Sequence, residues 1–112
     1  MALSAKSVRK QLALLKPIMN GFSLKTIRKG QNMIGELMEL GNRNKIIVKK
    51  HTFEKFEGAW AIPKDERREG VILYLHGGGF TCGDLEYAMG FGSALAVRHG
   101  TKVFCVGYRL AP

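Results

Sequence analysis

The stretch LYLHGGGF, residues 73–80, sets three consecutive glycines directly after an apolar segment. The run VILYL, residues 71–75, has the length and composition of a strand that is buried on both faces in a parallel sheet. Gly77, Gly78 and Gly79 would then lie at the carboxyl end of that strand, the edge at which open α/β sheets bind ligands. Because glycine reaches backbone conformations that other residues avoid, this segment can turn its N–H groups toward a concave space. The stretch therefore predicts a site lined by backbone donors.

The residues that follow complete a strand, helix and strand unit. An apolar helical pattern begins after Asp84, a good N-cap, and stops at Gly100. The segment TKVFCVGY, residues 101–108, then reads as a second buried strand. A strand, a crossover helix and a second strand form a βαβ unit, so we expect a mainly parallel sheet.

Two segments before this unit predict an antiparallel hairpin or meander. IIVKKHTF and FEGAWAIP, within residues 45–63, are rich in the β-branched and aromatic residues that suit a pleated surface. The charged run KDERREG, residues 64–70, is then a solvated turn. The expected fold class is α/β, with the hairpin leading into the βαβ unit.

The N-terminal segment predicts two helices. The first has apolar residues at roughly helical spacing and ends in the region of Pro17 and Gly21. For the second helix, Ser23 is a plausible N-cap and Gly41 a C-terminal stop. Its expected packing face is formed by Leu24, Ile27, Ile34, Leu37 and Met38. We therefore divide the chain into a helical segment, 1–44, and a sheet-forming segment, 45–112.

The net charge of +9 over 112 residues is confined to the N-terminal half. Residues 1–50 hold eleven Lys and Arg against two Glu, whereas residues 51–112 hold seven basic and seven acidic side chains. A nucleic-acid partner is therefore not expected. The acid-free composition of residues 1–35 is shared by helices that lie on anionic membranes. The solvated basic face of a packed helix is the favoured interpretation, and weak membrane contact through residues 1–40 is the alternative.

Cysteine usage and hydropathy favour a cytoplasmic protein. Cys82 and Cys105 have neither CxxC nor zinc-ligand spacing, so we expect two buried thiols in a reducing compartment and no metal site. No apolar run approaches the roughly 18 residues that span a bilayer, and the N-terminus lacks a continuous apolar signal core.

Glycine-rich loops also bind phosphates, but the spacing here argues against that use. A P-loop requires GxxxxGK[ST], whereas Gly78 is followed by GFTCGD, with an acid at the position of the lysine. The dinucleotide pattern GxGxxG fails as well, since Gly77 and Gly79 are followed by Cys82. Stabilisation of a developing oxyanion by two converging N–H groups is the favoured chemistry.

Two motifs together resemble a known family. HGGGF, residues 76–80, followed by YRLAP, residues 108–112, is similar to the hormone-sensitive-lipase-like branch of the α/β-hydrolases, an esterase family with HGGG-type oxyanion loops. The intervening GDLEYA also resembles family members.

This resemblance implies a carboxylic-ester hydrolase acting on small-molecule esters without a cofactor. It implies that Gly78 and Gly79 supply the oxyanion N–H groups, and that Gly77 allows the turn. His76 would orient the loop and would not be the base, while Phe80 would contact the substrate. The N-terminal helices would form part of a cap. Tyr108 and Arg109 would support the motif, with the Arg109 guanidinium tying loop carbonyls or a carboxylate together.

The residues that such a mechanism needs for nucleophilic attack are missing from this sequence. None of the four serines lies in a GxSxG elbow; the surroundings of Ser93 read FGSAL, inside the expected crossover helix. We therefore expect the N-terminal fragment of an esterase, without catalytic serine, acid or histidine and inactive alone. The alternative is a non-catalytic remnant or binding module with a degenerate hydrolase fold and a basic membrane-surface helix.

Overall fold

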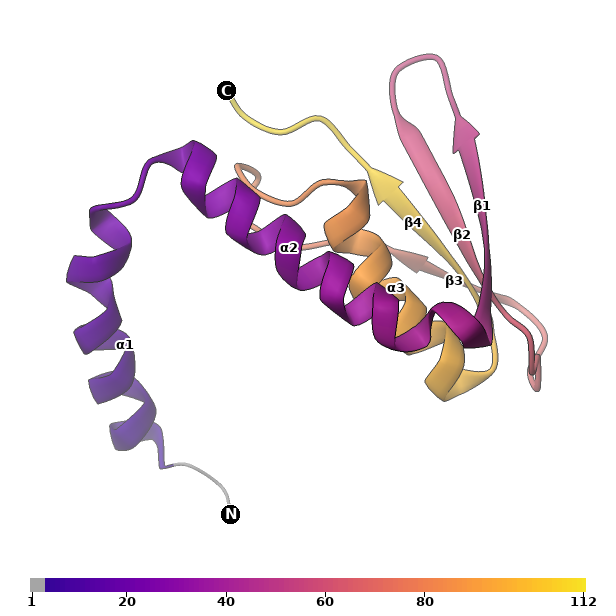
Figure 1. Ribbon diagram of the computed structural model, residues 1–112, viewed down its shortest axis with the longest axis horizontal. Coiled ribbons are helices and arrows are strands. Elements are labelled where there is room, and N and C mark those ends of the chain that lie inside the picture. The colour runs from indigo at the N-terminus through magenta and orange to yellow at the C-terminus, as the bar shows by residue number, and fades with distance from the viewer. Residues whose placement is uncertain (1–3) are drawn as a thin grey trace.

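The computed structural model describes residues 4–112 and contains a four-stranded mixed sheet with helices on one face (Figure 1). Residues 1–3 of the predicted helical segment lie outside this range. The order along the chain is α1 (Ala5–Asn20), α2 (Leu24–Asn42), a 3-10 turn (Arg43–Lys45), β1 (Ile46–Thr52), β2 (Glu57–Pro63), β3 (Val71–Tyr74), α3 (Leu85–His99) and β4 (Lys102–Gly107).

The sheet confirms the predicted hairpin and βαβ unit. Its strand order is β1-β2-β4-β3, in which β1 with β2 and β2 with β4 are antiparallel and β3 with β4 is parallel. Asp84 caps α3, because its Oδ1 accepts the Tyr87 N–H at 2.9 Å. Gly100 ends α3 in the left-handed conformation, with its N–H donating to the Ala96 carbonyl. The predicted caps thus fix where the crossover helix begins and ends.

Small residues form the contact between α3 and the sheet. Gly92 of α3 lies over Cys105, where an added Cβ would stand 2.2 Å from the thiol sulfur. This close approach buries an apolar core that consists of Ala59, Ala61, Ala88 and Ala96 together with Ile46, Leu85, Met89, Val103 and Cys105. On the opposite face of the sheet, Trp60 packs against Phe104 with ring centroids 4.8 Å apart. The described helices leave that aromatic face uncovered.

The packing face of α2 differs from the one that we predicted. The N-cap at Ser23 is confirmed, since its side chain accepts the Thr26 N–H. However, α2 contacts α3 through Gly35 and Gly90, whose backbones meet so closely that a Cβ on Gly90 would lie 2.4 Å from the Gly35 carbonyl oxygen. Backbone-to-backbone approach requires a face without side chains, so the helix turns its glycine inward. Four of the residues that we expected to pack are 37 to 64% exposed: Leu24, Ile34, Leu37 and Met38.

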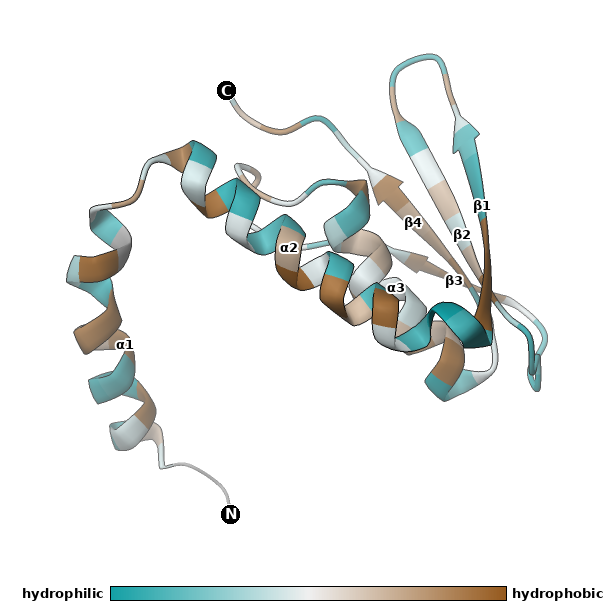
Figure 2. Ribbon diagram, viewed as in Figure 1, coloured by the Kyte–Doolittle hydropathy of each residue, from teal (hydrophilic) through white to brown (hydrophobic). Residues whose placement is uncertain are grey.

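The helix α1 stands apart from the sheet and from α3 (Figure 1). It continues through Pro17, which we had placed near its end, and stops at Asn20 before Gly21. Brown apolar bands alternate with teal polar ones along α1 and α2 (Figure 2). No helix among residues 4–112 is long and apolar enough to cross a membrane.

The strand β3 is an edge strand, and only one of its faces is buried. Ile72 and Tyr74 pack against the core beneath α3, whereas Val71 and Leu73 are 56% and 62% exposed. A strand is buried on both faces only when layers cover both sides of its sheet. In the described chain α3 covers one side only.

Candidate functional site

The glycines of HGGGF lie in a tight turn between β3 and α3. The carbonyl of Gly78 accepts the N–H groups of Thr81 and Cys82 at 3.2 and 3.1 Å, and the Thr81 hydroxyl at 3.2 Å. Three consecutive residues have positive φ: 140° at Gly78, 63° at Gly79 and 61° at Phe80. The chain therefore turns at residues 78–80, a few residues after β3 ends at Tyr74.

Two of the three glycines are required by this geometry. A Cβ on Gly78 would lie 2.2 Å from the Cys82 carbonyl oxygen, and Gly79 has a left-handed backbone although its surroundings are open. Gly77 has neither a close neighbour nor a positive φ, so the turn-permitting role expected of it falls to Gly78 and Gly79. Phe80 adopts a conformation that costs roughly 1–2 kcal/mol for a residue with a side chain, and its side chain is 76% exposed. Strained backbone of this kind is concentrated at functional sites.

Carbonyl groups of the loop accept hydrogen bonds, whereas the N–H groups of its three glycines remain free. The carbonyls of Gly78, Phe80 and Thr81 each accept at least one hydrogen bond. Within residues 4–112, in contrast, the N–H groups of Gly77, Gly78 and Gly79 donate to no protein acceptor. Since Gly77 and Gly79 are exposed and Gly78 is half-buried, these donors lie at the surface of the turn.

His76 is a buried support of the loop. Its side chain is 3% exposed, and its Nδ1 lies 2.9 Å from the Gly77 carbonyl oxygen. Donation to that oxygen requires the Nδ1–H tautomer. The Nε2 atom is buried without a partner among the described residues. The ring is held between Tyr108, which stacks on it, and Gly83, where a Cβ would come within 2.5 Å of Nδ1.

Arg109 does not occupy the position that we expected for it. Its side chain is exposed, and it forms no hydrogen bond or ion pair with the rest of residues 4–112. The bonds to loop carbonyls come from Arg28 of α2, whose Nε donates to Thr81 O at 2.6 Å and whose Nη2 donates to Ala111 O at 2.7 Å. Sequence reasoning missed Arg28, because its partners lie 53 and 83 positions away and no local pattern marks it.

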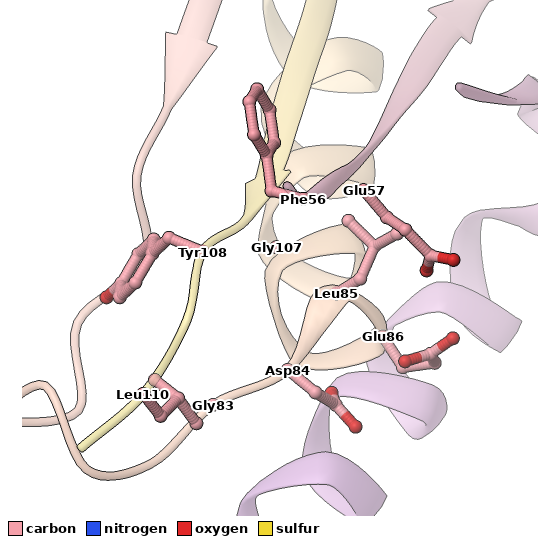
Figure 3. A pocket seen from close by; sticks show the side chains of 9 residues that line it. All are labelled: Phe56, Glu57, Gly83, Asp84, Leu85, Glu86, Gly107, Tyr108 and Leu110. Carbon is pink, nitrogen blue, oxygen red and sulfur yellow. The ribbon is translucent and has the colours of Figure 1, made fainter. Parts of the chain in front are cut away.

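A cavity of about 360 Å³ opens beside the loop at the carboxyl end of β4 (Figure 3). Tyr108 lies on one side of it, and the carboxylates of Asp84 and Glu86 lie on the other. Both acids have structural partners, since Asp84 caps α3 and Glu86 pairs with Lys50 at 3.5 Å. The lining of this cavity does not include Gly77, Gly78 or Gly79. The carboxylates on its wall do not suit an apolar acyl group. The full lining is Phe56, Glu57, Gly83, Asp84, Leu85, Glu86, Gly107, Tyr108 and Leu110.

The described residues offer no activated nucleophile near the loop. Ser93 is completely buried within α3, and its hydroxyl has no partner there. Cys82 and Cys105 are buried free thiols, as predicted. Burial raises the pKa of the Cys105 thiol to about 12, so it remains protonated at neutral pH. In the range that the structure describes, no group of three or more His, Cys, Asp and Glu could hold a metal ion.

Comparisons with known proteins show that the chain is similar to α/β-hydrolases. A family described as having the α/β-hydrolase fold matches residues 72–112. A versiconal hemiacetal acetate esterase of Emericella nidulans is 40% identical over 50 residues, which cover 45% of this chain and 18% of that protein. The chain therefore spans less than a fifth of this curated relative.

Solved structures match nearly the whole chain. A hyperthermophilic esterase from Pyrobaculum calidifontis is 28% identical with a TM-score of 0.67, and the match covers 100% of this chain and 38% of that one. An α/β-hydrolase enzyme from the metagenome of Lake Arreo, Spain, is 26% identical with a TM-score of 0.66, covering 93% of this chain and 37% of that one.

Proposed function

We propose that this chain supplies the oxyanion hole of a serine carboxylic-ester hydrolase. It has the first strands and the crossover helix of the α/β-hydrolase fold, and it resembles the hormone-sensitive-lipase-like esterases. The supporting observation is the asymmetry of the HGGGF turn. The carbonyls of Gly77, Gly78 and Phe80 accept hydrogen bonds, while the N–H groups of Gly78 and Gly79 have no protein acceptor within residues 4–112. Donors left free at the carboxyl end of a strand suit an oxygen atom of a ligand.

These two N–H groups would act on the charge that develops during acyl transfer. When a nucleophilic oxygen attacks an ester carbonyl, the carbonyl oxygen becomes negatively charged. Fixed backbone donors stabilise this oxygen without reorganising, and loss of one such donor costs roughly 3–4 kcal/mol of transition-state stabilisation. Serine, histidine and an acid perform the remaining proton transfers, so the chemistry requires no cofactor. None of those three catalytic groups is identified in this sequence.

The exposed side chain of Phe80 and the N-terminal helices would shape the substrate site. Phe80 directly follows the two donor glycines, and its 76% exposed ring can contact the acyl or alcohol group of a small-molecule ester. The helix α2 is bonded to the same loop through Arg28. Residues 1–44 would therefore serve as part of a cap over the mouth of the site.

A chimeric enzyme tests this function. Residues 1–112 replace the matched 38% of the Pyrobaculum calidifontis esterase, and hydrolysis of p-nitrophenyl butyrate is measured. We expect the chimera to be active, and Gly78→Ala to lower kcat by about 100-fold or more, since the added Cβ collides with the Cys82 carbonyl and displaces the donors.

The matched control is Gly41→Ala, which adds the same methyl group at the far end of α2, where nothing lies within 4 Å. It should leave kcat within about twofold of the parent chimera. A chimera that melts cooperatively but does not hydrolyse the ester, or equal rates for the two variants, would overturn the proposal.

A membrane-binding role is the second candidate, and the free position of α1 favours it. Leu12, Leu14 and Ile18 of α1 are exposed by 57 to 73%. Its charged residues are Lys6, Arg9, Lys10 and Lys16, with no acid. Such a helix suits the surface of an anionic bilayer. The chain should sediment with vesicles containing phosphatidylserine and not with phosphatidylcholine alone; equal sedimentation with both would reject this role.

A further inference from the structure

The guanidinium of Arg28 joins three segments that are distant in the sequence. From α2, its Nε donates to the Thr81 carbonyl at 2.6 Å, and its Nη2 donates to the Ala111 carbonyl at 2.7 Å. The two receiving segments are also bonded directly, since the Ala111 N–H donates to the Phe80 carbonyl at 2.8 Å. The first turns of α2, the glycine turn and the YRLAP segment therefore meet at a single side chain.

These two hydrogen bonds, from Arg28 to the carbonyls of Thr81 and Ala111, form a specific contact that we call the clamp. Nε and Nη2 lie on the same edge of the planar guanidinium, so one rigid group holds two carbonyl oxygens at a fixed separation. Arg28 is half-buried, and no carboxylate within residues 4–112 forms an ion pair with it. A hydrogen bond with one charged partner is stronger than a neutral one.

These bonds act on the part of the turn where the backbone is strained. Phe80 has φ 61°, and its carbonyl is held by Ala111; the next carbonyl, of Thr81, is held by Arg28. The Thr81 N–H in turn donates to Gly78 O. The Gly78 carbonyl belongs to the same peptide group as the Gly79 N–H, so these bonds fix the carbonyl side of that group and leave the Gly79 N–H free.

We propose that Arg28 is a positioning residue, which holds the HGGGF turn in its donor-presenting conformation and couples it to the movement of α2. This inference rests on the proposed oxyanion role of the turn. Arg28 would touch neither substrate nor reacting atoms. It would act through Thr81 and Ala111, so that displacement of the cap helix would loosen the turn.

The first test uses amide hydrogen exchange of the full chain and does not depend on enzymatic activity. Arg28→Met removes both bonds, and we expect exchange of the Thr81, Cys82 and Ala111 N–H groups to accelerate by about tenfold or more. Lys29→Met is the matched control, because it removes one positive charge at the next position of α2 without removing a hydrogen bond to the loop. It should leave these three rates unchanged.

The second test measures kinetics in the chimera described above. Arg28→Met should lower kcat for p-nitrophenyl butyrate by about tenfold with little change in KM, because a loosened hole loses interactions made in the transition state. Arg28→Lys keeps the positive charge but lacks the planar guanidinium with its two parallel donors. Its kcat should therefore lie between those of Arg28→Met and the parent chimera.

The outcomes separate the inference from the proposed function. Unchanged exchange in Arg28→Met would overturn the clamp whatever the chemistry of the turn. Faster exchange with unchanged kcat would overturn the positioning role while the effect of Gly78→Ala still supports the oxyanion hole. If Arg28→Met and Lys29→Met changed the exchange rates and kcat equally, Arg28 would contribute only its positive charge. That result would also overturn the clamp.

Discussion

Tyr108 stacks on His76, with ring centroids 4.3 Å apart and planes inclined by 7°. The phenol hydroxyl also donates to the main-chain carbonyl of His76, at the start of the glycine turn. The two residues belong to HGGGF and YRLAP, the motifs on which the family resemblance was based. Their contact gives the paired occurrence of these motifs a physical reason, since the second motif supports the first.

Truncating Tyr108 in two steps should separate the stack from the hydrogen bond. Tyr108→Phe keeps the ring and removes the bond to the His76 carbonyl, so it should lower the free energy of unfolding by about 1 kcal/mol. Tyr108→Ala also removes the stacked ring and should cost at least about 1 kcal/mol more. Urea denaturation followed by circular dichroism measures both values. Equal stability of the two variants would mean that the stacking contributes nothing.

Two glycines of α2 should respond oppositely to the same substitution. Gly41→Ala adds a methyl group in open space and should stabilise the chain by up to about 1 kcal/mol through helix propensity. Gly35→Ala places a Cβ 2.4 Å from the Tyr87 Cα and 2.8 Å from the Glu86 carbonyl oxygen, so α2 must move away from α3. We expect a loss of about 2 kcal/mol or more. A shift of the same sign in the two melting temperatures would contradict this packing.

Local rules predicted most of the elements but not the way in which they meet. Asp84, Gly100 and Ser23 could be recognised as caps, because a cap satisfies backbone groups within a few residues of itself. The apolar stripe of α2 misled the prediction of its packing face, since hydrophobic periodicity ignores the close approach that Gly35 and Gly90 permit.

The candidate site was predictable to a similar degree. The glycine turn is encoded locally, in the residue types at positions 77–80. The clamp is not, because Arg28 bonds carbonyls, which every residue carries, at positions 81 and 111. Only the folded arrangement shows that Arg28 holds the turn while Arg109, within the motif, does not.

The stability of the chain should fall in alkaline solution through Cys105. Burial raises the pKa of this thiol to about 12 from an ordinary value of 9.0. Between these two pH values the unfolded chain releases the proton and the folded chain retains it, so the free energy of unfolding decreases as pH rises. The loss attributable to this residue approaches about 1.4 kcal/mol per pH unit. Cys105→Ala should unfold with a correspondingly shallower pH dependence between pH 9 and 11; identical slopes would contradict the assignment.

The chain alone is expected to give no ester hydrolysis. The proposed oxyanion hole would stabilise a charge that forms only after nucleophilic attack, and the sequence contains no serine in a GxSxG elbow. Incubation of purified chain with p-nitrophenyl butyrate should match buffer, and Gly78→Ala should leave that background unchanged. Saturable turnover abolished by Gly78→Ala would show that a nucleophile within these 112 residues had been overlooked.

Substitutions at two adjacent residues of β3 should have different effects, one on self-association and the other on folding stability. Leu73 is 62% exposed on an edge strand, beside Val71 and Leu75, which are 56% and 60% exposed. Exposed apolar edges pair with other chains, so the protein should scatter light increasingly with concentration, and Leu73→Lys should suppress this without loss of stability. Ile72→Lys changes the neighbouring residue, which packs against the core. It should lower the melting temperature, because a buried charge lacks a partner there. If Leu73→Lys destabilised the fold as much as Ile72→Lys, the exposed face of β3 would have to be covered in solution.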